Sequence, residues 1–144
     1  MDELSPRAVV RIPVHRGRAT ILVVDEAEAV RGESCRVLRR AGYAAIPARG
    51  GIEAAWVLRG SGRVDLLISD VSMLECDDYH FGLPLAHMQQ WLPVLYIAPW
   101  SHEETVRRGI LHPGAPYLQK PFPPSALVRA VGRLLHARPR PVPI

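Results

Sequence analysis

The sequence contains little of three things: it has one lysine among 18 basic residues, two cysteines, and only 6% aromatic residues. It has no apolar run of about 18 residues, the length needed to cross a bilayer. Its charged start, Met1-Asp2-Glu3, lacks the apolar segment of a secretory signal. The cysteines, Cys35 and Cys76, do not have the spacing of a zinc site or a disulfide framework. We therefore expect free thiols in a reducing compartment, and a cytoplasmic protein without a membrane partner.

Charge is concentrated at the two ends of the chain. Residues 1–18 hold four arginines against two acids, residues 137–144 hold two arginines and no acid, and residues 19–136 hold 12 basic and 12 acidic residues. Basic ends without interleaved aromatic residues are weak grounds for a nucleic-acid partner, so we interpret them as solvated arms. The length of 144 residues indicates one domain over 19–137, between a loosely ordered basic extension (1–18) and a Pro/Arg tail (138–144).

Short apolar runs alternate with helical patterns, which is typical of βαβ units. Three of the runs are continuously apolar, as in strands that are covered on both faces of a parallel sheet. The expected strands are 21–24, 43–46, 66–68, 94–97 and 117–118, and the expected helices are 30–41, 52–60, 83–90, 103–111 and 125–135. This alternation predicts an α/β fold, a flavodoxin-like doubly wound sheet of five parallel strands in order 2-1-3-4-5 with five helices in three layers.

Tryptophans and histidines do not form a recognisable cofactor or metal motif. We expect Trp56, Trp91 and Trp100 to pack in the core or in an interface. The histidines lack metal-ligand spacing, and we expect surface positions for His80, His87, His102, His112 and His136.

Charged residues follow three of the predicted strands at the point where each strand ends. Asp25 and Glu26 follow the first strand, Asp70 the third and Lys120 the fifth. Ligands of an open parallel sheet bind at the carboxyl ends of its strands, where the strand order reverses, so we expect the three carboxylates to converge there. Proton uptake or a bound cation relieves their repulsion. We expect Mg²⁺, because it prefers one or two carboxylates together with waters and phosphate oxygens.

A carboxylate beside a metal can act as a nucleophile toward phosphorus, and Asp70 has the matching position. Lys120 and the metal would then neutralise the transferring phosphoryl oxygens. Lys120 is the only lysine against 17 arginines, and a compact ammonium suits a single phosphoryl oxygen. Each acid also has a simpler interpretation: Asp25 and Glu26 as acids at a helix start, and Asp70 as the cap of a turn.

Four segments together resemble the response-regulator receiver domain, the family of the single-domain chemotaxis regulator. They are ILVVDE at 21–26, LLISDVSM at 66–73, PVLYI at 93–97 and YLQKPF at 117–122. The resemblance extends over about residues 19–137, and it implies that the Lys120–Pro121 peptide bond is cis.

The resemblance also implies a role for each site residue. Asp25 and Glu26 are the acidic pair at the Mg²⁺ ion, and Asp70 is the phosphoacceptor. The backbone carbonyl of Ser72 is a further metal ligand, and Lys120 contacts the phosphoryl group.

The sequence departs from the family pattern at the switch. Ala98 stands where the family usually has Thr or Ser, whose hydroxyl bonds the phosphoryl group and couples it to an aromatic residue on strand five, here Tyr117. Pro99 replaces the small residue that usually follows. In the loop after Asp70, Leu74 replaces the usual proline, and the stretch 75–81 is longer and more acidic. The conformational response to phosphorylation is therefore expected to be weakened or rewired.

The function implied is a single-domain response regulator that takes a phosphoryl group from a histidine kinase or phosphotransfer protein and signals to a downstream protein by contact in a phosphorelay. The alternative is a phosphorylation-independent binding module. We do not expect an enzyme, because an aspartate-based phosphatase needs a second Asp two residues after its nucleophile, where this chain has Ala27 or Ser72. No output domain is expected, and a homodimer is left open.

Overall fold

The computed structural model describes residues 18–60, 63–74 and 92–137. Within these residues the chain forms five strands, four α-helices and one short 3-10 helix. The predicted helix 83–90 lies outside the described residues, as do residues 1–17 of the basic extension and the tail. In chain order the elements are β1 (Thr20–Val24), α1 (Glu28–Arg40), β2 (Ala44–Ala48), α2 (Gly51–Gly60), β3 (Leu66–Asp70), η2 (Val71–Leu74), β4 (Val94–Ala98), α4 (His102–Arg107), β5 (Tyr117–Gln119) and α5 (Pro124–Ala137).

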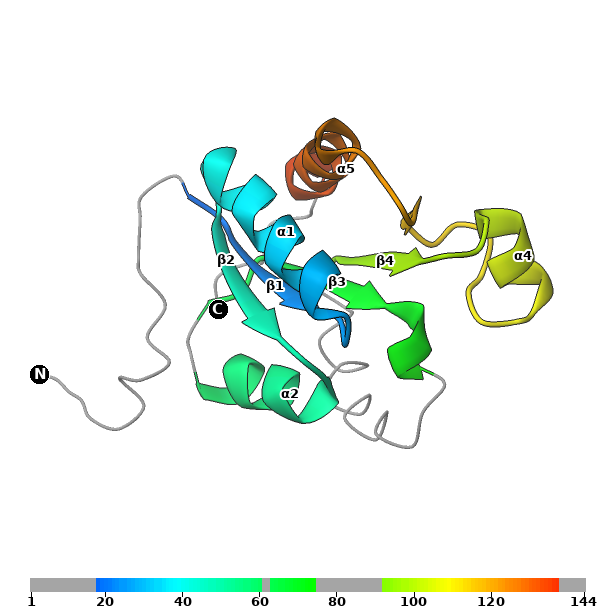
Figure 1. Cartoon of the computed structure of the whole chain (residues 1–144), viewed down its shortest axis with the longest axis horizontal. Coiled ribbons are helices and arrows are strands. Elements are labelled where there is room, and N and C mark those ends of the chain that lie inside the picture. The colour runs from blue at the N-terminus through cyan, green and yellow to red at the C-terminus, as the bar shows by residue number, and fades with distance from the viewer. Residues whose placement is uncertain (1–17, 61–62, 75–91, 138–144) are drawn as a thin grey trace, which may run out of the picture.

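The five strands form one parallel sheet in the order β2-β1-β3-β4-β5, which confirms the predicted fold and topology. Helices α1 and α5 cover one face of the sheet and α2 covers the other, so the sheet is the middle of three layers (Figure 1). No helix in the described part of the chain is long and apolar enough to cross a membrane.

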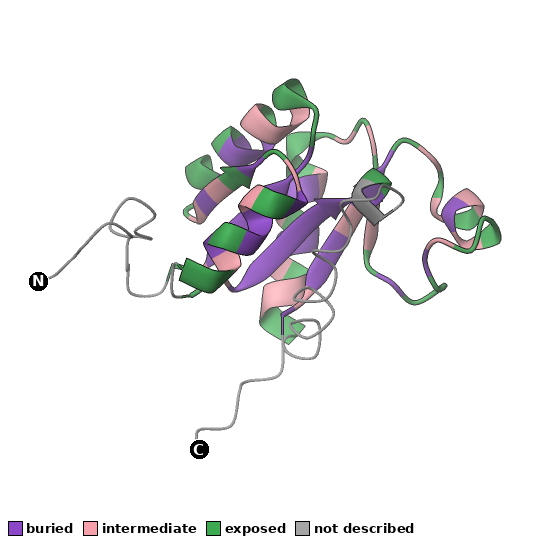
Figure 2. Ribbon diagram, turned by 90° about the horizontal axis from the view of Figure 1, so that it is seen from below, coloured by how far each residue is buried: buried purple, intermediate pink, exposed green. Residues whose placement is uncertain are grey.

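Strand β1 is continuously apolar because helices cover both faces of the sheet at this strand. Ile21 and Val23 pack toward α1 and α5, whereas Leu22 and Val24 pack toward α2. All four side chains are at most 1% exposed. Figure 2 shows the same burial along the central strands. Burial of each such side chain contributes about 1.5–3 kcal/mol, so both faces of the central strands hold the carboxyl ends of the sheet in place.

Helix α4 is shorter than the predicted helix 103–111. Its start is capped by the Ser101 hydroxyl, which accepts a hydrogen bond from the Glu104 N–H at 3.0 Å. It ends at Arg107, because Gly109 has a φ of 78° and turns the chain out of the helix. The predicted end at residue 111 is therefore wrong.

Trp56 is not a core residue. Its side chain is 64% exposed on α2, one turn after Ile52, which is 63% exposed. Trp91 lies outside the described residues, and Trp100 is half-buried. Cys35 is a buried free thiol, in agreement with the sequence, while Cys76 lies outside the described residues.

Gly42 ends the turn between α1 and β2 with a φ of 102°, and the space around it is open. We predict that Gly42→Ala lowers the free energy of unfolding by about 1–2 kcal/mol through backbone strain alone. Gly60→Ala is the matched control, since its surroundings are equally open and its φ is not positive. That variant should be unchanged or more stable by about 0.5 kcal/mol in urea unfolding. Equal stability of Gly42→Ala and the wild type would contradict the assignment of strain.

Candidate functional site

Three charged residues from distant parts of the sequence meet at the carboxyl ends of β1, β3 and β5. Asp25 follows β1, Asp70 is the last residue of β3, and Lys120 follows β5. The Lys120 Nζ atom forms an ion pair with Asp25 Oδ2 at 2.9 Å and donates a hydrogen bond to Asp70 Oδ2. The cis peptide bond implied at Lys120–Pro121 is present. The sequence therefore predicted this meeting of Asp25, Asp70 and Lys120 correctly.

The two aspartates are held in the same way. Asp25 Oδ1 accepts a hydrogen bond from the Ala27 N–H, and Asp70 Oδ1 accepts one from the Ser72 N–H, both at 2.8 Å. In each case the donor lies two residues after the aspartate, which is the geometry of an Asx turn. The simpler interpretation as the cap of a turn is thus correct for one oxygen of Asp70. Asp25, interpreted as an acid at a helix start, bonds the N–H of Ala27, the N-cap residue of α1, through one oxygen. The other oxygen of each faces Lys120.

The surroundings of Lys120 act on its pKa in opposite directions. Burial is the largest single effect and lowers the pKa, but the hydrogen bonds and negative charges of Asp70 and Asp25 together raise it above the ordinary lysine value. The exposed fractions of the side chains are 17% for Lys120, 2% for Asp25 and 8% for Asp70. The ammonium is therefore retained at neutral pH as the counter-charge of two buried carboxylates.

Glu26, the third predicted carboxylate, does not join the other two. Its side chain is exposed, and the described residues contain no group of three His, Cys, Asp or Glu side chains that could hold a metal ion. The remaining pair still fits Mg²⁺, which takes one or two carboxylates with waters and phosphate oxygens. Asp25 Oδ2 is buried, and among the described residues it contacts only the Lys120 ammonium, in the 2.9 Å ion pair, so this oxygen still has room for a cation as a further partner. The residues that would hold the ion are Asp25 and Asp70, with Ser72 in the following turn.

The loop after β4 is bound to β5 through three consecutive carbonyls. Tyr117 Oη donates a hydrogen bond to the Trp100 carbonyl and lies 3.3 Å from the Ala98 carbonyl. Gln119 Nε2 donates to the Pro99 carbonyl at 3.1 Å. Ala98 is fully buried and has no hydroxyl to offer. The Tyr117 hydroxyl is therefore engaged by the backbone of this loop.

Aromatic contacts also hold the same loop. The ring of His102 stacks on Tyr117, with ring centroids 5.2 Å apart and an angle of 14° between the planes. The Arg108 guanidinium lies 4.4 Å from the centroid of the Trp100 ring, a cation–π contact. His102 is half-buried, and its Nε2 lacks a partner among the described residues. The prediction that His102 is a surface residue is therefore confirmed only in part, because Tyr117 covers one side of its ring.

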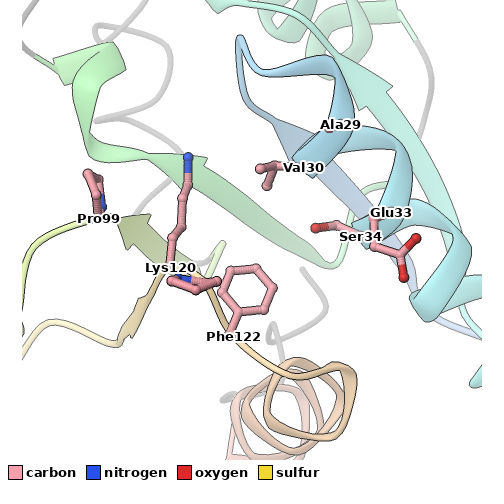
Figure 3. Close-up of a pocket in the computed structure, with 8 residues that line it drawn as sticks. Ala29, Val30, Glu33, Ser34, Pro99, Lys120 and Phe122 are labelled. Atoms are coloured by element: carbon pink, nitrogen blue, oxygen red, sulfur yellow. The ribbon is translucent and has the colours of Figure 1, made fainter.

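A cavity of about 440 Å³ opens beside Lys120, between the start of α1 and the loop before α5. Its walls are mostly apolar and include Val30, Pro99 and Phe122. Figure 3 shows the Lys120 side chain along this cavity, with its ammonium at the end of β3 and the ring of Phe122 on the side of α1. An apolar surface thus borders the charged site.

Sequence reasoning missed Arg31. Its Nη1 atom donates a hydrogen bond to the Asp25 carbonyl at 2.8 Å, and lies 3.4 Å from the Glu26 carbonyl. One sequence signal was present: a basic residue near the start of a helix opposes the helix dipole and calls for a compensating contact.

Residues 21–132 match the family of the response regulator receiver domain. The chain belongs to this family. It is 28% identical over 120 residues to the sensor kinase CckA of Brucella abortus, covering 83% of this chain and 13% of that protein. It is 31% identical over 116 residues to the DNA-binding transcriptional regulator NtrC of Bradyrhizobium, covering 81% of this chain and 24% of that protein. The chain thus spans less than a quarter of the length of each of these relatives.

Solved structures agree with this membership. A response regulator receiver protein from Burkholderia phymatum is 30% identical with a TM-score of 0.66, covering 85% of this chain and 100% of that one. The chemotaxis response regulator CheY4 of Vibrio cholerae is 28% identical with a TM-score of 0.66, covering 81% of this chain and 98% of that one. Receiver domains are signalling modules of two-component systems, accept a phosphoryl group, and as a family bind Mg²⁺ at an acidic pocket.

The ion pairs of Lys120 lead to a stability prediction. Lys120→Met leaves two buried carboxylates without their counter-charge and should lower the free energy of unfolding by about 3 kcal/mol at neutral pH. Because the folded-state pKa of Lys120 is raised, its contribution is complete below the ordinary lysine pKa of about 10.4 and is lost as the pH rises through the folded-state value. The difference between wild type and variant should therefore stay constant up to about pH 10 and shrink as the pH is raised further in urea unfolding. A pH-independent difference would show that Lys120 acts through packing alone.

Proposed function

We propose that this chain is a response regulator that accepts a phosphoryl group on Asp70 from a histidine kinase or phosphotransfer protein. The observation that carries the proposal is the arrangement of Asp25 and Asp70 around the Lys120 ammonium at the carboxyl edge of the sheet. This is where ligands of a doubly wound sheet bind. Family membership supports the same chemistry. The role is that of a signalling protein in the cytoplasm and not of a metabolic enzyme.

The Asp70 carboxylate supplies the nucleophile. Its Oδ1 is engaged by the Ser72 N–H, so Oδ2, the oxygen on the side of Lys120, attacks the phosphorus. The O–P bond forms as the N–P bond of a phosphohistidine breaks, and the electron pair of that bond leaves with the imidazole nitrogen. The Lys120 ammonium neutralises charge on the transferring phosphoryl oxygens.

A divalent cation completes the charge balance of this proposal. Asp25 and Asp70, with the Ser72 carbonyl as a further ligand, would hold Mg²⁺, and this ion would supply positive charge to the phosphoryl oxygens. Glu26 would act on the same ion through water, because its side chain is exposed and does not form a ligand group with the two aspartates.

The apolar cavity beside Lys120 supports a protein as the phosphodonor. A partner that delivers a phosphoryl group to Asp70 must approach the carboxyl edge of the sheet, where Val30 and Phe122 border the cavity. Protein contacts typically combine an apolar centre with a polar rim, and the cavity offers apolar surface of this kind. After phosphorylation, the domain signals to a downstream protein by contact.

The direct test is intact-protein mass spectrometry after exposure to a small-molecule phosphodonor and Mg²⁺. We expect one phosphoryl adduct on the wild type, and loss of the adduct in Asp70→Asn and in magnesium-free buffer. Glu33→Gln should retain it, since this variant removes an exposed carboxylate that borders the same cavity. If the folded wild type carries no adduct with Mg²⁺ present, the proposed phosphoacceptor is wrong.

A second candidate function is a binding module whose contacts do not depend on phosphorylation. The observation in its favour is the switch region, where Ala98 has no hydroxyl and Tyr117 Oη is engaged by the Trp100 carbonyl. In this alternative the fold is kept for binding, and the β4–α4 loop stays in one conformation whether or not Asp70 is modified.

The indole N–H resonance of Trp100 reports whether the β4–α4 loop responds to phosphorylation of Asp70. In the wild type we expect the phosphodonor and Mg²⁺ to leave this resonance in place, because no hydroxyl links Asp70 to the loop. Ala98→Thr restores the missing hydroxyl and should make the resonance shift on phosphorylation; a Trp100→Phe variant assigns the signal. An equally large shift in the wild type would mean that the loop responds to phosphorylation without a hydroxyl at residue 98.

A further inference from the structure

The side chain of Arg31 reaches back to the turn that carries the acidic pair. Arg31 is the fourth residue of α1, and long side chains of a helix point toward its N-terminus. Its Nη1 atom lies 2.8 Å from the Asp25 carbonyl and 3.4 Å from the Glu26 carbonyl. A single guanidinium nitrogen is thus shared between two consecutive carbonyl oxygens.

This contact completes the fixing of Asp25. Its N–H donates a hydrogen bond to the Ala48 carbonyl of β2 at 3.2 Å, and its Oδ1 accepts from the Ala27 N–H. With Arg31 on the carbonyl, both backbone groups and one carboxylate oxygen of Asp25 are held. The remaining oxygen, Oδ2, therefore has one direction open to it, toward Lys120 and Asp70.

Glu26 is also contacted by Arg31, through its backbone carbonyl and at the longer of the two distances. Among the described residues, the hydrogen bond from Arg31 is the one contact that ties Glu26 to another side chain. Helix α1 gives the turn little help, because its N-cap residue Ala27 has no side-chain hydrogen bond to offer. The conformation from which the Glu26 carboxylate projects is thus set by the Asx turn of Asp25 together with the guanidinium.

The position of Arg31 is electrostatically unfavourable unless it has such a role. A cation near the start of a helix opposes the helix dipole by roughly 0.3–1 kcal/mol. It would also repel a divalent cation held by the neighbouring carboxylates. Replacing Arg31 therefore has two opposite effects on Mg²⁺ affinity. Loss of the charge strengthens Mg²⁺ binding, whereas loss of the fixed turn weakens it.

We propose that Arg31 is a positioning residue that holds the Asp25–Glu26 turn in the conformation required for Mg²⁺ binding. The inference rests on the proposed function, since it assigns Arg31 a role toward the same ion. Residues that orient metal ligands typically change metal affinity by 10- to 100-fold when they are replaced. The fixed turn outweighs the repulsion, because the guanidinium makes its shortest hydrogen bond to the carbonyl of a ligand residue.

The test is a calorimetric titration of the full chain with Mg²⁺ alone. Arg31→Met keeps the aliphatic stem and removes both the donor and the charge, and should weaken Mg²⁺ affinity by about 10-fold. Arg36→Met is the matched control: it removes one positive charge from the same helix, where Arg36 pairs only with the exposed Glu33. This control should bind Mg²⁺ as the wild type does.

Thermal unfolding without Mg²⁺ separates positioning from helix stability. Arg31→Lys keeps the charge and one donor, and we expect an affinity between those of Arg31→Met and the wild type. Wild-type Mg²⁺ affinity in both Arg31 variants overturns the inference, even if they unfold earlier. Equal weakening in Arg36→Met also overturns it, because charge would then be the cause. If the wild type itself takes up no Mg²⁺, both the proposed function and the inference fail. If the wild type binds Mg²⁺ and the Arg31 variants bind it equally well, the inference alone fails.

Discussion

The ammonium of Lys120 lies between the carboxylates of Asp25 and Asp70. The strand order determines how far the Lys120 side chain must extend to reach them. Strands β1 and β3 are neighbours, so the two aspartates are adjacent. Strand β5 is separated from β3 by β4, at a spacing of about 4.8 Å per strand. The long, flexible stem of a lysine crosses the end of β4, where Ala98 has a small side chain and its carbonyl accepts a hydrogen bond from the Lys120 N–H at 2.7 Å.

The same three charges explain why the site is reactive as well as stable. Two carboxylates against one ammonium leave an excess of one negative charge in a nearly buried position. Each buried ion costs several kcal/mol of lost hydration, which only close partners offset. The Asx turns hold one oxygen of each aspartate, so the unbalanced charge is concentrated on the oxygens that face each other across Lys120. Further positive charge is favoured at that place.

The sequence predicted the parts of the molecule that depend on local pattern. Continuous apolar runs such as 21–24 arise because both faces of a strand are covered, and strand ends then locate Asp25, Asp70 and Lys120. Other features depend on contacts between distant residues. The end of α4 is determined by the left-handed conformation of Gly109, and the exposure of Glu26 beside the buried Asp25 is a property of the folded chain.

Arg31 and the stack of His102 on Tyr117 were missed for a related reason. Arginine is abundant in this chain, so no single arginine stands out by composition. A histidine that lacks the spacing of a metal ligand gives no sign in the sequence that an aromatic ring from a distant strand will stack on it. Both roles are visible only when α1 and α4 are placed against the carboxyl ends of the strands.

The scarcity of lysine has a consequence for covalent modification. Because Lys120 is the chain's only lysine, its ammonium is the only side-chain amine on the whole molecule. Acetylation, or coupling to any amine-reactive reagent, would therefore modify either the N-terminus or the functional site itself. The two ion pairs slow acylation of that amine. Only the neutral amine reacts, and the raised pKa of Lys120 keeps it protonated. The rate of acylation at residue 120 thus measures whether Asp25 and Asp70 form their ion pairs with Lys120.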